Sequence, residues 1–108
     1  MAEPYLSDLR VLTSSWSDAD QRLGVLECRH FFSGAAAYRE GSIAASLTPA
    51  GLAFKVPDEV RDRLLASGRA APLRYFPDAP IKRNYVLFAD PMVINPDDAA
   101  SLLRGKPI

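Results

Sequence analysis

The sequence has one cysteine and one histidine among its 108 residues. A single cysteine cannot form an intrachain disulfide, so nothing points to an oxidising compartment. One cysteine and one histidine also leave a metal site short of ligands, and neither a CxxC nor an HxxxH spacing is present. The sequence therefore predicts no metal, no cofactor and no disulfide framework.

Long apolar runs are missing as well. A run such as Tyr85–Ala89 is far shorter than the roughly 20 apolar residues that a membrane-spanning helix needs. The first residues lack the basic start and apolar segment that are typical of a secretory signal. We expect no membrane partner and a cytoplasmic location.

The chain has no excess charge of either sign, with 13 Lys and Arg against 13 Asp and Glu. Bulk attraction to nucleic acid or to an anionic membrane is therefore not expected. The segment 61–83 is locally basic, and two interpretations of it are open: a solvated helix face with a hairpin tip, or a nucleic-acid patch. Because recognised nucleic-acid-binding motifs are absent from this segment, we favour the first, and nucleic acid is not the partner we expect.

The middle of the chain, residues 28–56, has the alternation of a sheet with one face on a core. It predicts four short strands separated by turn residues, at 28–32, 35–39, 43–47 and 52–56. At the first turn, Ser33-Gly34, we expect Gly34 to adopt a backbone conformation that a residue with a Cβ enters only at a cost.

Helical periodicity and capping signals flank these strands. The pattern over residues 5–23 predicts one helix or two, and a second helical region is predicted over 57–67. A last helix is predicted over 95–104, where it starts with an Asn-Pro-Asp-Asp cap. Segments 73–76 and 84–89 read as two strands, the second apolar enough to lie inside the sheet. This order predicts a single α+β domain over residues 1–108: a two-layer fold with an antiparallel sheet and helices on one face.

Several spaced features resemble the N-terminal domain of the TfoX family, regulators associated with bacterial competence. These features are Phe31-Phe32-Ser33-Gly34, Tyr38, Gly41, the strand Leu52–Val56, and later Pro72–Tyr75, Tyr85 and Pro91. The resemblance covers about residues 28–103 and implies a fold similar to that of secretion chaperones. It also implies a non-enzymatic regulatory or protein-interaction domain. Ser33 and Ala36 depart from the family pattern, where glycines are common.

Cys28 and His30 form the best candidate for chemistry, because residues i and i+2 of a strand point to the same face. A small-ligand-binding or hydrolytic domain with a pocket near these two residues is the alternative function. A two-residue motif is weak, and we interpret it as an apolar cysteine and a surface histidine. The sequence assigns no catalytic residue.

Two further interpretations concern glycines and aromatic residues. The glycines Gly34, Gly41 and Gly51 lie at turns and lack the spacing of a phosphate-binding loop. The aromatic residues Tyr38, Tyr75, Tyr85 and Phe54 could form a platform for bases if exposed, but their strand spacing favours a place in the core.

Small residues mark the candidate interaction surface, which comprises Ser33, Gly34, Ala36, Ala37 and Tyr38. Small side chains let another backbone approach closely, so we expect a protein partner or a homodimer to dock on this strand and its neighbours. The rival explanation is that the alanines make room for the N-terminal helix.

Overall fold

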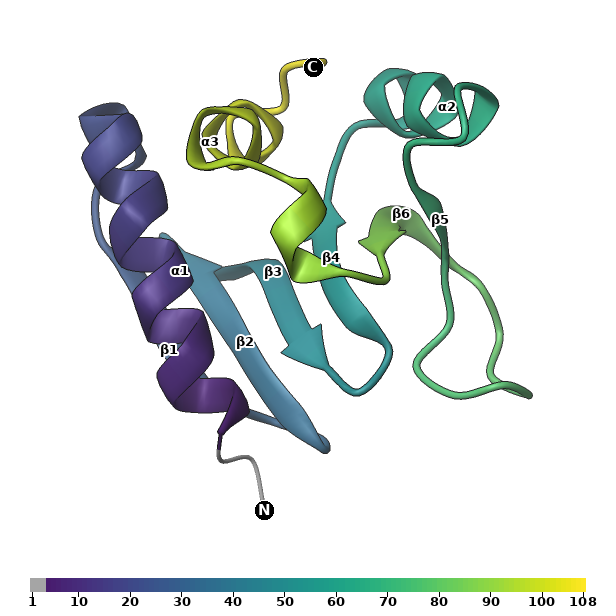
Figure 1. Ribbon diagram of the computed structural model, residues 1–108, viewed down its shortest axis with the longest axis horizontal. Helices are drawn as coiled ribbons and strands as arrows, with labels where there is room; N and C mark the ends of the chain where they lie inside the picture. Colours follow the sequence, from purple (N-terminus) through teal and green to yellow (C-terminus); the bar gives the residue numbers. More distant parts are fainter. Residues whose placement is uncertain (1–3) are drawn as a thin grey trace.

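The structure, a computed structural model, describes residues 4–108. Its elements are α1 (Tyr5–Ala19), the 3₁₀ turn η1 (Gln21–Leu23), β1 (Leu26–Phe31), β2 (Gly34–Arg39), β3 (Ser42–Thr48), β4 (Gly51–Lys55), α2 (Asp58–Ala66), β5 (Ala71–Leu73), β6 (Lys82–Phe88), η2 (Pro91–Val93) and α3 (Pro96–Leu103). The strands form one antiparallel sheet in the order β1-β2-β3-β4-β6-β5 (Figure 1). The predicted α+β class with an antiparallel sheet is confirmed.

Short turns explain why β1 to β4 lie side by side in chain order. At the β2–β3 turn, Glu40 and Gly41 both have positive φ, as the two central residues of a type I′ hairpin require. At the β1–β2 turn the positive φ belongs to Phe32, whereas Gly34 lies in β2 with no positive φ. The prediction of a special backbone conformation at Gly34 is therefore wrong.

A close backbone approach is what requires glycine at position 34. A Cβ added to Gly34 would lie 2.2 Å from the carbonyl oxygen of Leu47 and 2.8 Å from the Cα of Thr48. Both obstacles are main-chain atoms of β3, so β2 and β3 can approach this closely only because position 34 has no side chain.

The helices gather over one hydrophobic cluster, the core. α1 contributes Leu9 and Trp16, and the Trp16 ring packs 5.3 Å from that of Phe54 on β4. The alternate positions of β2, Ala35 and Ala37, lie in the same cluster, where their small side chains leave room for α1. Helices α2 and α3 add Val60, Leu64, Leu102 and Leu103.

The ambiguity over residues 5–23 is resolved into two pieces. α1 ends at Ala19, and the Asp20 carboxylate then accepts a hydrogen bond from the Arg22 backbone N–H at the start of η1. Gly24, with φ of +71°, ends this turn. The predicted cap of the last helix is confirmed, since the Asn95 side chain accepts a 2.8 Å bond from the Asp98 N–H.

The fifth strand differs from its prediction. β5 covers Ala71–Leu73 rather than 73–76, and it lies at the sheet edge, where the missing N–H of Pro72 is tolerated. Beyond Leu73 the chain leaves the ladder and forms a long connection that returns as β6 (Figure 1). β6 lies between β4 and β5, so the expectation that this apolar strand is internal is confirmed.

Candidate functional site

Cys28 and His30 do lie on one face of β1, opposite Ala37 and Ala35 of β2. Half-buried Cys28 places its Sγ 3.5 Å from the Thr13 Oγ1 of α1, whereas the His30 side chain is exposed. The contact with the Thr13 hydroxyl of α1 thus explains the position of the Cys28 side chain without a catalytic role. Neither residue lines any of the three hollows described below.

The candidate interaction surface divides between the interior and the exterior. Gly34 is buried, and Ala36 and Ala37 are 0% exposed, whereas Ser33 is exposed and Tyr38 is half-buried. β2 is also paired on both sides, with β1 and with β3, so it offers no free edge. The small residues of β2 therefore serve packing within the chain in this structure, and any docking at this end of the sheet involves the neighbouring strand β1.

β1 is the exposed edge strand at this end of the sheet. Within residues 4–108 it pairs with β2 alone, over all six of its residues. Its outer row of backbone N–H and C=O groups has no strand to pair with, which is the usual template for strand addition. The opposite edge, β5, has three residues and includes Pro72. β1 is therefore the longer and more regular of the two edges.

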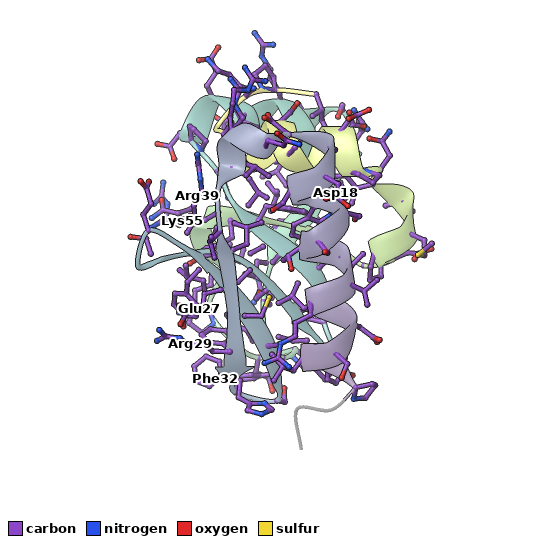
Figure 2. The ribbon with its side chains drawn as sticks, turned by 90° about the vertical axis from the view of Figure 1, so that its left-hand side faces the viewer. Asp18, Glu27, Arg29, Phe32, Arg39 and Lys55 are labelled. Atoms are coloured by element: carbon purple, nitrogen blue, oxygen red, sulfur yellow. The ribbon has the colours of Figure 1, made fainter. Side chains whose placement is uncertain are left out.

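Charged residues of β1 lie on the face of the sheet opposite α1, which we call the open face (Figure 2). Glu27 and Arg29 form an ion pair with each other, and both side chains are more than half exposed. The Arg29 guanidinium also lies 5.4 Å from the centre of the Tyr38 ring. Exposed pairs of this kind contribute little to stability, so these charges are available to another molecule.

Aromatic residues gather at the β1–β2 turn. The rings of Phe31 and Phe32 are 4.5 Å apart, and Tyr75 from the β5–β6 connection contacts both. Phe32 is 80% exposed, and Val25, just before the start of β1, is 85% exposed. Exposed apolar side chains thus flank the free edge at both ends.

The open face also carries three half-buried tyrosines, Tyr38, Tyr75 and Tyr85. Burial raises the pKa of Tyr75, while the nearby Ser46 hydroxyl opposes this rise, and burial raises the pKa of Tyr85. The Ser46 Oγ is fully buried and makes no hydrogen bond of ordinary geometry.

Phe54 lies in the core, as its strand spacing favoured. The three tyrosines lie outside the hydrophobic cluster, so for them the core interpretation is wrong. The four rings form no single platform.

A polar hollow of about 530 Å³ opens at the start of β1, lined by residues such as Arg22, Arg29 and Arg39. Each of these cations already has a partner. Arg22 hydrogen bonds lower the pKa of Asp20, Arg29 pairs with Glu27, and Arg39 donates to the Leu23 and Leu103 carbonyls. Each arginine that lines this hollow within residues 4–108 thus has a partner in the chain, and only the exposed pair of Arg29 and Glu27 is easily exchanged for another molecule.

An apolar groove of about 480 Å³ separates α1 from η2 and the β3–β4 turn. Exposed Val11 and Met92 lie on its rim. Nothing in the structure indicates what would cover this groove.

The basic stretch is largely paired as well. Arg63 forms an ion pair with Glu59, Arg69 with Asp98, and Arg74 donates to the Ala79 carbonyl. Among residues 4–108, no cluster of three or more His, Cys, Asp or Glu side chains could hold a metal ion, and no helix is long and apolar enough to cross a membrane.

Sequence reasoning missed Val25, Glu27, Arg29 and Phe32 as a group, since an edge strand cannot be distinguished from an inner strand before strand order is known. The one signal in the sequence was the pair of charged residues within the strand, Glu27 and Arg29, because charged side chains are a device by which edge strands avoid unwanted pairing. Comparison with family models, curated proteins and solved structures finds no match to this chain.

Proposed function

We propose that this chain is a non-enzymatic interaction domain that binds a protein partner through the free edge of β1. The observation that supports this proposal is the unpaired edge of Leu26–Phe31, flanked by exposed Val25 and Phe32. A regulatory role, which the resemblance to the TfoX N-terminal domain implies, and a cytoplasmic location belong to the same proposal.

Strand addition explains how such an edge recognises a protein. An incoming strand satisfies the unpaired backbone groups of β1, while side chains of alternate positions contact the two faces. Val25 and Phe32 then lose water-exposed apolar area at the ends of the new ladder, which favours binding. The charges of Glu27 and Arg29 select a partner strand of matching pattern.

The test uses two substitutions that leave the fold intact, because both side chains are largely exposed. Val25→Lys combined with Phe32→Lys removes the apolar ends of the edge, and Val93→Lys, at an exposed position in η2, is the matched control. Far-ultraviolet circular dichroism and thermal unfolding confirm that each variant is folded.

Proximity labelling in the native cell then compares the proteins that each form contacts, a second copy of the chain included. We expect the double variant to lose proteins that the wild type and Val93→Lys both label. Identical sets of labelled proteins from all three forms would remove the β1 edge as the interaction surface.

A further inference from the structure

We infer that the β1 edge binds a second copy of this chain in antiparallel orientation, about a twofold axis beside Cys28. The inference rests on the proposed function and names the partner for that same edge. The two six-stranded sheets then become one continuous sheet of twelve strands, with α1 of each copy on the same face.

The charge order of β1 selects this register. When Cys28 lies opposite Cys28 of the second copy, Glu27 lies opposite Arg29 in both halves of the pair. Directly opposed residues of an antiparallel pair share a face, and opposite charges there attract. Two neighbouring symmetric registers also keep the same faces together. One is centred on Glu27 and places Glu27 opposite Glu27 of the second copy, and the other is centred on Arg29 and places Arg29 opposite Arg29. Like charges repel in both. A shift by a single residue would exchange the two faces of one sheet.

Helix α1 has a second self-complementary charge pattern at the same axis. Thr13 contacts Cys28, so the axis that passes Cys28 also passes the neighbouring α1 residue, Ser14. Arg10 and Asp18 lie four residues on either side of Ser14, and the twofold axis therefore brings Arg10 near Asp18 of the second copy. Both side chains are exposed, and among residues 4–108 no ion pair involves either of them.

These α1 residues face the free edge of β1. Arg10, Ser14 and Asp18 line a shallow groove of about 350 Å³ between the helix and the start of β1. α1 packs over β1, β2 and β3, with β2 in the middle. Neighbouring strands are about 4.8 Å apart, so two α1 axes that each lie over β2 are separated by about 14 Å in the dimer. That separation exceeds the distance of about 8–10 Å between closely packed helices, so the side chains of Arg10 and Asp18 bridge the two copies.

The same register covers the exposed apolar ends of the edge. Val25 lies opposite Phe31 of the second copy, and Phe32 lies immediately beyond that pair. The ladder, both charge patterns and both apolar ends thus fit one arrangement about one axis.

Charge reversal provides the test, with the full chain purified and its mass measured by sedimentation equilibrium. Wild-type chains of 11.8 kDa should associate to twice that mass. Glu27→Arg opposes Arg to Arg across the axis, and Arg29→Glu opposes Glu to Glu, so each variant alone should dissociate about tenfold more readily or worse. Glu59→Arg, which breaks an exposed ion pair on α2, is the control and should associate like the wild type.

Mixing the two variants separates the intermolecular contact from effects within each chain. Glu27→Arg and Arg29→Glu chains restore opposite charges across the axis only when they meet each other, and neither regains its own internal pair. We expect the equimolar mixture to form heterodimers at least about tenfold tighter than either homodimer. A mixture that associates no better than the separate variants would overturn the register.

Thiol crosslinking measures the approach of the two α1 helices independently. In a Cys28→Ser background, a short bifunctional maleimide should link Ser14→Cys chains into a dimer, whereas it should not link chains that carry Ala66→Cys on α2. Equal crosslinking at both positions would overturn the proposed axis. A wild-type chain that stays monomeric at its solubility limit would overturn self-association, while the labelling experiment above would still decide whether the edge binds a different protein.

Discussion

Gly34→Ala tests the close approach of β2 and β3 with a single methyl group. The added Cβ would lie 2.2 Å from the Leu47 carbonyl oxygen and 2.8 Å from the Thr48 Cα. Comfortable contacts between non-bonded heavy atoms begin at about 3.5 Å, so the β3 backbone must move by roughly 1 Å. That movement strains the pairing of two central strands, because a packed interior transmits such a shift to its neighbours.

The expected loss is large relative to the stability of a small domain. Overpacking costs about 1–3 kcal/mol, and the obstacle here is backbone rather than a side chain that can rotate away, so we expect a loss of about 3 kcal/mol. For a domain of this size, that loss lowers the melting temperature by about 12–24 °C.

Gly41→Ala is the matched control. No heavy atom lies within 4 Å of a Cβ added there, but its φ of +81° makes a side chain unfavourable by about 1 kcal/mol. Urea unfolding followed by the fluorescence of the single tryptophan, Trp16, compares the two variants at constant m-value. The explanation from close approach is refuted if Gly34→Ala loses no more stability than Gly41→Ala.

Three further predictions concern the turns, the core and the open face. Glu40→Asn should stabilise the chain by about 0.5 kcal/mol in urea unfolding, because Asn-Gly is favoured in a type I′ turn and Glu40 has a φ of +53°; no gain would contradict the assigned turn. Trp16→Ala should cost about 3–5 kcal/mol by circular dichroism, since the ring is 1% exposed, and a loss under about 1 kcal/mol would contradict its place in the core. The raised pKa of Tyr75 means that its unfolded form releases a proton first, so the stability it contributes is present below pH 10.0 and is lost as the pH rises above that value. Ser46→Ala removes the hydroxyl that opposes the rise in the Tyr75 pKa, so the titration of Tyr75 followed by absorbance at 295 nm should move to higher pH. The Tyr75 signal is the one that is lost in Tyr75→Phe. A move to lower pH would contradict the effect of the Ser46 hydroxyl on Tyr75.

Local features made most of the elements predictable. The Asn95 cap, the Glu40-Gly41 turn and the strands β3 and β4 depend on neighbouring residues only, and the structure has them close to where the sequence placed them. Burial does not alternate along β3 and β4, because the second face of the sheet is covered there as well. The prediction of a strand at 73–76 is wrong because contacts with distant residues decide the conformation there. Its residues have a strand-like composition, but Tyr75 instead packs on Phe31 and Phe32, which are far away in the sequence.

The candidate site depended on information that no local pattern contains. The sequence singled out the β1–β2 region and its small residues, but it assigned the docking role to Ala36 and Ala37, which are fully buried. Whether a strand is an edge depends on which strands pair, and the pairing of β6 with β4 joins segments about thirty residues apart. Only that pairing leaves β1 at one edge and β5 at the other.

By itself the sequence determined the fold class and the order of the elements, because periodicity and caps are set by residues close to one another. The tertiary structure decided which strand is free, which charges face outward and which glycine lies against a backbone. Those properties arise from contacts between distant segments, whose free energy depends on the packed arrangement as a whole.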